Sequence, residues 1–224
     1  MGESPKAESS YKDVYASYPK SEFAPLALLE IGLLKQKSQL LRDADTAFIK
    51  LMDEFPNSNS AAQAGYERAQ IAVSLTDTLK SLRLFTEIAD KFTNSEYGDQ
   101  SRYKIAMYYR SKGILDSARV HFGKLVDRLE NISIAAEAQY RIGESWLKQK
   151  EIGNAIEAFN QVRQKFSNIE DWFTLSLLGL GESYEQVKNI EAAIEVYQTL
   201  STLRADDDFG KAAQAKLKKY GRAQ

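Results

Sequence analysis

The chain repeats itself every 37 residues, and this period constrains the fold more than any other feature of the sequence. A short phrase recurs as YPKS at 18–21, FPNS at 55–58, FTNS at 92–95, LENI at 129–132 and FSNI at 166–169. Seven residues before each phrase stands an apolar column of Tyr11, Phe48, Phe85, Phe122 and Phe159. A period of this length is typical of stacked repeats, in which each unit buries its apolar face only against its neighbours.

Each repeat contains two helical patterns. The second pattern has a small column (Ala7, Ala44, Ser81, Ala118, Ala155) and an apolar column (Val14, Leu51, Ile88, Leu125, Val162), at the 3–4 spacing of one helix face. The first pattern has a small column of Gly32, Ala69, Ala106, Gly143 and, one residue late, Gly181. We expect these small residues to lie where another backbone approaches closely, and the Phe column to fill the wedge between helical hairpins.

The columns set the expected helix bounds. First helices are predicted over 22–37, 59–75, 96–111, 133–149 and 170–187, and second helices over 41–55, 78–92, 115–129, 152–166 and 190–203. Pro19 and Pro56 each close a second helix, and Asn57, Asn94, Asn131 and Asn168 follow as turn residues. The last repeat is one residue longer, with the insertion expected in the 168–174 turn.

Composition excludes several classes of function. Only 12 Gly and 4 Pro occur in 224 residues, which favours helix nearly throughout. The absence of Cys and the single His121 exclude thiolate zinc sites, cysteine nucleophiles and multi-histidine metal sites. A balance of 30 Lys+Arg against 31 Asp+Glu does not favour nucleic acid, and no apolar run is long enough to span a bilayer. We therefore expect no catalytic residue, cofactor or metal.

Two motifs that could suggest chemistry have plainer interpretations. Gly179-Leu180-Gly181 could be part of a phosphate-binding loop, but it lies inside a first helix with no strand before it, so close packing is the prediction. His121 precedes the core residue Phe122, and we expect it to be partly exposed and inert. Carboxylate pairs such as Glu182 with Glu185 are expected on solvated helix faces.

The two ends differ from the repeats between them. Residues 1–21 carry a second helix without a first one, so we expect this sequence to be a fragment of a longer protein. Residues 208–224 are predicted to form one more helix. The acidic run Asp206–Asp208 at its start and the lysines 216, 218 and 219 near its end match the helix dipole. The alternative is that the acidic run and the lysines are an acidic and a basic binding site for a partner.

The columns resemble the tetratricopeptide repeat. The match is visible in YRIGESW at 140–146 with Ala155 and Phe159, and in Gly32, Ala44, Phe48 and Pro56. The resemblance implies an all-α, right-handed α-α superhelix, a solenoid of five 37-residue helix-turn-helix repeats. A single solenoid over 1–224 would then comprise a half-repeat (1–21), repeats at 22–58, 59–95, 96–132, 133–169 and 170–207, and a terminal helix (208–224).

The usual tetratricopeptide unit has 34 residues, whereas this unit has three more after the Pro position. This longer junction resembles bacterial envelope repeat proteins, namely the lipoprotein subunit of the outer-membrane β-barrel assembly machinery and the periplasmic coordinator of the Tol–Pal system. The implied function is a non-enzymatic scaffold in envelope assembly or maintenance. Its location would be periplasmic or at the outer membrane, and a lipid anchor could lie outside this sequence. The alternatives are a cytoplasmic adaptor and a helical accessory domain of a cell-wall enzyme.

The resemblance also implies a concave groove, lined by first helices, that binds a protein or extended peptide. The groove residues would be Leu26, Leu29, Leu33, Gln63, Tyr66, Glu67, Gln70, Gln100, Tyr103, Lys104, Met107, Arg110, Glu137, Tyr140, Arg141, Glu144 and Lys148, continued by Leu178, Glu182 and Gln186. Tyr66, Tyr103 and Tyr140 form a ladder with one ring per repeat, suited to holding a peptide. The alternative is that these rings pack between neighbouring first helices. The paired Asn residues of a carboxylate clamp are absent, so a cochaperone of that kind is not expected.

Overall fold

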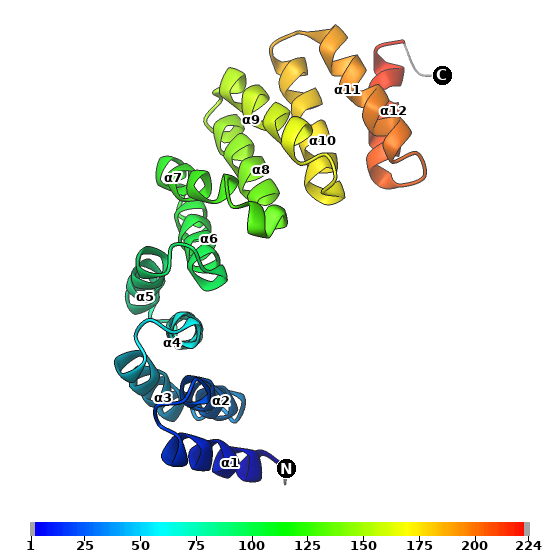
Figure 1. The fold of residues 1–224 in the computed structure, drawn as a ribbon. Helices are drawn as coiled ribbons and strands as arrows, with labels where there is room; N and C mark the ends of the chain where they lie inside the picture. Colours follow the sequence, from blue (N-terminus) through cyan, green and yellow to red (C-terminus); the bar gives the residue numbers. More distant parts are fainter. Residues whose placement is uncertain (1–2, 222–224) are drawn as a thin grey trace. The chain divides into compact units, whose positions relative to one another are not determined.

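In a computed structural model, residues 3–221 are described, and all regular structure among them is helical, with no strand. The all-α prediction is thereby confirmed for this part of the chain. The helices, drawn in Figure 1, are α1 (Glu3–Ser17), α2 (Phe23–Lys37), α3 (Leu41–Glu54), α4 (Asn59–Ser74), α5 (Thr78–Lys91), α6 (Glu96–Ser111), α7 (Leu115–Val126), η1 (Leu129–Asn131), α8 (Ile132–Lys148), α9 (Ile152–Lys165), α10 (Glu170–Gln186), α11 (Ile190–Leu203) and α12 (Asp208–Lys219).

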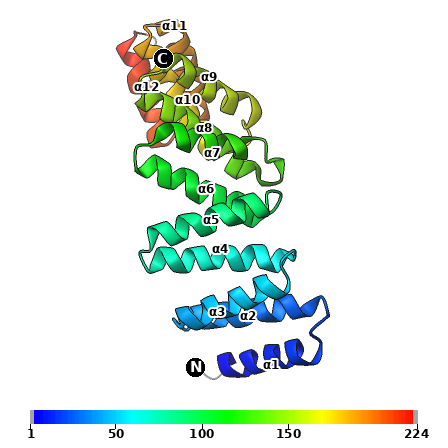
Figure 2. The ribbon, with the colours of Figure 1, turned by 90° about the vertical axis from the view of Figure 1, so that its left-hand side faces the viewer.

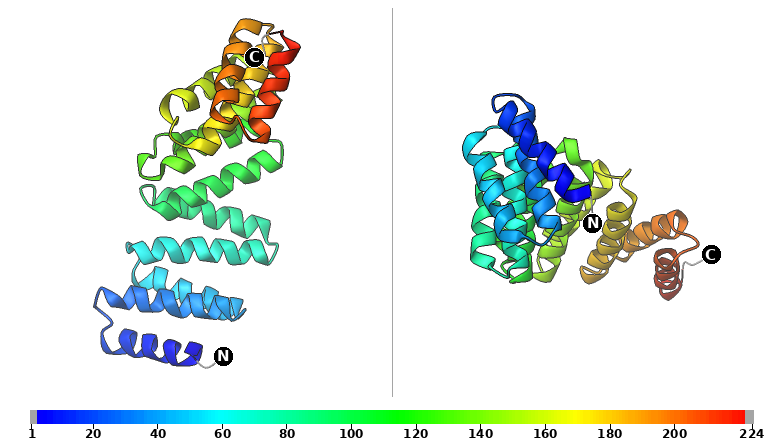
Figure 3. Two further views of the ribbon diagram at one scale, coloured as in Figure 1. Left: turned by 90° about the vertical axis from the view of Figure 1, so that its right-hand side faces the viewer. Right: turned by 90° about the horizontal axis from the view of Figure 1, so that it is seen from below.

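The chain divides into two compact units, Met1–Ile105 and Ala106–Gln224. Within the first unit, helices α1 to α5 pack in chain order, each on the next, and α2 also packs on α4 (Figure 2). Within the second unit, α7 to α12 pack in the same sequential way, and α8 also packs on α10. Helix α12 lies beside α11 at the end of this series (Figure 3). The first helices α2, α4, α8 and α10 therefore each touch their own second helix, and α2 touches α4 as α8 touches α10.

The predicted bounds agree with the structure to within one residue at most helix ends. The terminal helix expected over 208–224 ends earlier, since α12 stops at Lys219. Among the repeats, the largest correction concerns the second helix expected over 115–129, because α7 ends at Val126 and a short 3₁₀ helix follows over Leu129–Asn131. The side chain of Asn131 accepts a hydrogen bond from the Ile134 N–H at 3.2 Å. This cap lets α8 begin at Ile132, one residue earlier than predicted.

The second-helix aromatic column forms the centre of each repeat. Phe48, Phe122, Phe159 and Tyr197 are fully buried, and the small columns beside them are buried as well. A Cβ built on Gly143 would lie only 2.5 Å from Cε1 of Phe159, and one built on Gly32 would lie 2.3 Å from Cε1 of Phe48. We expected these glycines to make room for another backbone. The structure corrects this prediction, because the group that occupies the space is the aromatic ring of the same repeat.

The ring of Phe159 is in contact with two first helices. A Cβ on Gly179 of α10 would lie 2.8 Å from Cζ of Phe159, while Gly143 of α8 adjoins Cε1 of the same ring. A Cβ built on Gly181, two residues further on, would likewise lie 2.5 Å from Cε1 of Tyr197. The close-packing interpretation of Gly179 and Gly181 is thus confirmed.

The five turns between first and second helices share one backbone conformation. Gln39, Thr76, Gly113, Lys150 and Lys188 all have φ between 58° and 73°, in the left-handed region. In the second of these turns, the Thr76 N–H donates to the Val73 carbonyl and the Asp77 N–H donates to the Ala72 carbonyl, both at 2.9 Å. This pair of bonds is the Schellman ending of a helix. Because only Gly113 is a glycine, the packing of the two helices imposes the turn on four unfavourable residue types.

Helix α12 begins with the cap that the dipole interpretation predicts. The Asp207 carboxylate accepts hydrogen bonds from the backbone N–H groups of Phe209 at 2.9 Å and Gly210 at 3.1 Å. A carboxylate at this position also interacts favourably with the positive end of the helix dipole.

Candidate partner-binding surface

The candidate groove residues lie on α2, α4, α6, α8 and α10, and we call the set predicted above the first-helix surface. Their exposure differs widely. Leu29 is 4% exposed and belongs to the core around Phe48, so its side chain contributes packing. Leu26, Lys104, Lys148 and Gln186 are exposed, and the remaining residues are half-buried apart from Tyr66. The surface is therefore a mixture of core-supporting and accessible side chains.

The tyrosines at this surface join neighbouring first helices. Tyr66 of α4 is 9% exposed, and its ring centroid lies 5.6 Å from that of Phe85 and 5.7 Å from that of Tyr97 on α6. Tyr140 of α8 lies 5.5 Å from Trp172 of α10, with the ring planes 34° apart. Such tilted ring pairs are favourable beyond the area they bury. Of the two interpretations of the ladder, these contacts favour packing between first helices for Tyr66 and Tyr140.

Burial alters the chemistry of these tyrosines. Burial is the main cause that raises the pKa of Tyr140 to about 12, and the nearby Glu144 carboxylate adds to it. The pKa of Tyr66 is raised by burial first and then by the charge of Glu67. Both hydroxyls consequently stay protonated near neutral pH and can donate hydrogen bonds.

In the first unit the first-helix surface carries amides and a carboxylate. The Gln36 amide donates to Glu67 at 3.0 Å across α2 and α4. The Gln70 amide approaches the Tyr66 hydroxyl at 3.4 Å, and the Gln100 amide donates to Glu96 within α6 at 2.9 Å. Amide groups of this kind can hydrogen-bond both the N–H and the C=O of a peptide backbone.

In the second unit the surface is a chain of ion pairs. Glu144 bonds both Arg110, at 3.0 Å, and Arg141, at 2.8 Å, and Arg141 also pairs with Glu137 at 3.1 Å. Burial lowers the pKa of Arg141, but the bonds from Glu144 and Glu137 outweigh it and leave that pKa above its ordinary value. The guanidinium of Arg141 lies 5.1 Å from the Trp172 ring centroid, within the range of a cation–π contact.

Two aromatic members of this surface were missed by the sequence reasoning, Tyr97 and Trp172. Each lies at the start of a first helix, 31 residues after Tyr66 and 32 residues after Tyr140 respectively. The column they occupy reads Phe23, Ser60, Tyr97, Ile134 and Trp172, and its changing residue type hides it. A search for a second aromatic residue 31 or 32 positions after each tyrosine of the ladder, which is about six residues less than one repeat, could have found them.

The last first helix borders a hollow of about 570 Å³ next to α12. Its lining is Glu182, Glu185, Gln186, Ile190, Lys216, Lys219 and Tyr220. Glu182 and Gln186 belong to the predicted row, whereas the α12 residues were not predicted. Glu185 accepts hydrogen bonds from Lys216 at 2.6 Å, from Tyr197 at 3.1 Å and from Tyr220. Burial raises the pKa of Glu185, but these donors outweigh it and hold that pKa below its ordinary value.

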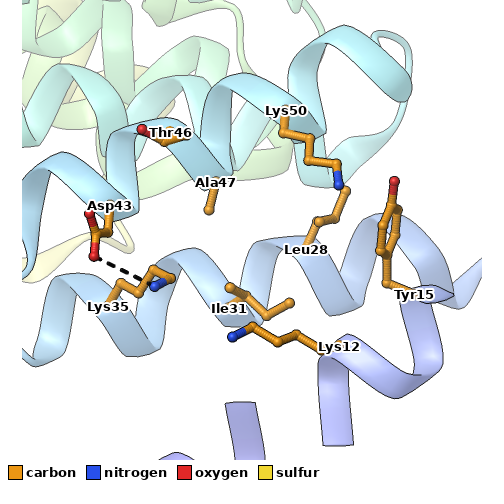
Figure 4. Close-up of a pocket in the computed structure, with 9 residues that line it drawn as sticks. All are labelled: Lys12, Tyr15, Leu28, Ile31, Lys35, Asp43, Thr46, Ala47 and Lys50. Atoms are coloured by element: carbon orange, nitrogen blue, oxygen red, sulfur yellow. Dashed lines mark ion pairs between the residues drawn. The ribbon is translucent and has the colours of Figure 1, made fainter. Parts of the chain in front are cut away.

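A second hollow, of about 320 Å³, lies between α1, α2 and α3 (Figure 4). Leu28, Ile31 and Ala47 form its apolar floor, and three lysines line it, one from each helix: Lys12, Lys35 and Lys50. Each amine has a carboxylate partner: Glu8 lies 2.7 Å from Lys12 and 3.5 Å from Lys35, Asp43 lies 3.8 Å from Lys35, and Glu54 lies 3.9 Å from Lys50. Three carboxylates thus balance the three lysine charges.

The described residues hold no group of three His, Asp or Glu side chains that could bind a metal ion. His121 instead stacks on Tyr109, with ring centroids 5.6 Å apart and planes 16° apart. Within residues 3–221, moreover, no helix has the length and apolar character that crossing a membrane requires.

Short repeated helix pairs, each packed on the next, define a helical repeat protein whose side chains present an extended surface. Two family models described as tetratricopeptide repeat match residues 137–168, over α8 and α9, and 176–207, over α10 and α11. These two segments of the second unit therefore match the tetratricopeptide repeat. No curated protein sequence matches the chain.

Similar solved structures support the fold. BtubC (BKLC) from P. vanneervenii is 10% identical, with a TM-score of 0.63, covering 91% of this chain and 89% of that one. YrrB, described as a TPR protein with an unusual peptide-binding site, is 15% identical, with a TM-score of 0.59 and coverage of 92% and 97%. A tetratricopeptide repeat protein from Parabacteroides merdae ATCC 43184 is 15% identical, with a TM-score of 0.52 and coverage of 99% and 87%. At these identities the likeness concerns the fold alone.

Proposed function

We propose that this protein is a scaffold that binds an extended protein segment along its first-helix surface. The observation that carries the proposal is the side-chain content of that surface, with amides and paired tyrosines in the first unit, and paired aromatic rings and paired charges in the second. Rigid aromatic side chains lose little entropy on binding, and the stacked helices hold them in place before a ligand arrives.

The likeness to YrrB adds weight, because that protein, which has a similar fold, is described as having a peptide-binding site. An extended segment would gain modest affinity from each repeat it crosses, so binding should depend on segment length. We further propose a role in bacterial envelope assembly or maintenance. That part depends on the FPNS-type junction, which occurs at 55–58 and in similar form at 92–95 and 166–169.

A photocrosslinking experiment tests where a segment binds. A random sixteen-residue peptide library is selected against the purified chain, and the selected peptides are crosslinked to variants with benzoylphenylalanine at single positions. We expect crosslinks from Lys104 and Lys148, which are exposed on first helices, and none from Val120, which is 61% exposed on the second helix α7. Crosslinks mainly from position 120, or no selected peptide at all, would refute the proposal.

A paired substitution provides a second readout. Tyr103→Ala with Arg110→Ala should weaken binding of the selected peptides while circular dichroism shows unchanged helicity. For the envelope role, the gene that encodes the whole protein is decisive: a signal peptide or lipid-attachment sequence supports it. A gene without either would favour a cytoplasmic adaptor, and an adjoining catalytic domain would favour an accessory domain of a cell-wall enzyme.

A further inference from the structure

In the second unit, two aromatic rings on neighbouring first helices contact an arginine side chain of the same chain. Tyr140 and Trp172 lie 5.5 Å apart, and the guanidinium of Arg141 lies 5.5 Å from the first ring centroid and 5.1 Å from the second. Glu144, at 2.8 Å, and Glu137, at 3.1 Å, hold that guanidinium in place. A cation, two ring faces and carboxylates thus form one cluster.

The first unit contains the same aromatic pair at equivalent repeat positions. Tyr66 precedes Tyr140 by 74 residues, which is two repeats, and Tyr97 precedes Trp172 by 75, which includes the one extra residue of the last repeat. The geometry is similar, with ring centroids 5.7 Å apart and planes at 50°. The two ring pairs are therefore counterparts.

The cation is missing from the first of these pairs. The residue equivalent to Arg141, 74 positions earlier, is Glu67. Among the residues that the structure describes, no Lys or Arg lies within ion-pair distance of Glu67, and none lies over Tyr66 or Tyr97. The one hydrogen bond that Glu67 makes there comes from the Gln36 amide, at 3.0 Å. A carboxylate and two rings are thus assembled around a position that lacks a positive charge.

The ring pair and the carboxylate lie close enough to influence one another. Burial is the main cause that raises the pKa of Tyr66 and of Tyr97. The charge of Glu67 comes next for Tyr66, whereas for Tyr97 the charge of Glu96 comes before that of Glu67. Tyr97 and Glu67 are half-buried, so a ligand can reach the cluster from their side, whereas Tyr66 is 9% exposed and supports it from below.

We propose that Tyr66, Tyr97 and Glu67 form a binding site for a basic side chain, arginine in preference to lysine, of the bound protein segment. The proposal rests on the scaffold function above and adds the chemistry of its partner. Arginine is preferred because its planar guanidinium can stack on a ring and bond a carboxylate at once, as Arg141 does in the second unit.

The chain offers a matched control for the charge of Glu67. Glu30 is the equivalent residue of the preceding repeat, but Leu29 and Ser60 stand there in place of the two tyrosines. Glu30→Gln removes a similar carboxylate without touching an aromatic pair. Glu67→Gln removes the charge at the proposed site, and Glu67→Arg supplies the cation from within the chain, as in the second unit.

The direct test titrates the ¹⁵N-labelled chain with N-acetyl-arginine methylamide and, separately, with its neutral isostere N-acetyl-citrulline methylamide. We expect amide shifts around Tyr66 and Tyr97 with arginine, about tenfold weaker affinity with citrulline, and a similar loss in Glu67→Gln. Glu30→Gln should bind like the parent. Glu67→Arg should lose binding and keep its melting temperature. Shifts of equal size with citrulline, or no shifts near Tyr66, would overturn the site.

Peptides separate this site from the general function. In peptides selected against the chain, replacing arginine by citrulline should weaken binding about tenfold, and the effect should shrink at high salt because charge is screened. Peptides that bind equally well with citrulline would overturn the site and leave the scaffold function standing. Arginine shifts near Tyr66 with no peptide selected would support the site and refute the scaffold function.

Discussion

Replacing Gly143 by alanine should destabilise the protein, although alanine is normally the better helix residue. The added Cβ would lie 2.5, 2.7 and 2.9 Å from Cε1, Cδ1 and Cζ of Phe159, whereas carbon atoms normally rest about 3.5–4.0 Å apart. The ring would have to retreat by about 1 Å to restore that separation. It is fully buried and touches Gly179 of α10 as well, so it has no open space to enter.

The magnitude follows from two opposing effects. Overpacking a core costs about 1–3 kcal/mol, and replacing glycine by alanine inside a helix returns about 0.8–1 kcal/mol. Gly123 of α7 supplies the control, because a Cβ there meets nothing within 4 Å and Gly123→Ala retains only the helix gain. The two variants should differ in stability by about 1–3 kcal/mol, since the helix gain is common to both.

Thermal unfolding followed by circular dichroism at 222 nm measures the difference. For a chain of this length about 1–3 kcal/mol corresponds to roughly 2–12 °C in melting temperature, with Gly143→Ala the lower. Gly143→Leu should fall further, by several kcal/mol in all. Combining Gly143→Ala with Phe159→Leu should cost less than the sum of the single changes, because the smaller side chain makes room. Equal melting temperatures for Gly143→Ala and Gly123→Ala would refute the ring-on-glycine account.

Two further predictions concern a turn and a carboxylate. Thr76 has φ 58°, a conformation that strains a β-branched residue, so Thr76→Gly should raise stability by about 1 kcal/mol in the same assay; a lower melting temperature would contradict it. Glu185→Gln should lower the melting temperature at pH 7, because three donors bond that carboxylate. Since the pKa of Glu185 lies below the ordinary 4.5, its stabilisation is present above pH 4.5 and lost as the pH falls through the lowered value. The gap between wild type and Glu185→Gln should therefore close in acid, and a gap independent of pH would show that the charge contributes nothing.

The helices could be predicted from sequence because their packing residues keep one type in each column. Phe48, Phe85, Phe122 and Phe159 recur at one period and are all buried in the structure. The turn conformation could not be predicted in the same way, because Thr76, unlike Gly113, carries no sequence mark of a left-handed backbone. There the tertiary packing of two helices overrides local preference.

The partner-binding surface was harder to predict than the core. Tyr66 and Tyr140 stood out by their period, but their ring partners Tyr97 and Trp172 occupy a column of mixed residue types. Leu29 shares the column of the tyrosines and is buried, because a period identifies a helix face but cannot say how deeply each member lies.

The position of Phe159 has a consequence for how the repeats divide. The ring belongs by sequence to the repeat at 133–169, yet it fills space against Gly179 of the following repeat. A cut between α9 and α10 would bare one face of this ring, so neither piece would retain the packing it has in the intact chain. Neighbouring repeats therefore share a residue, and the packing of this ring contributes to the free energy of folding of both repeats. We expect unfolding of one hairpin in the second unit to destabilise the next through such shared rings. The contact between two hairpins, and not the single hairpin, is then the unit of stability.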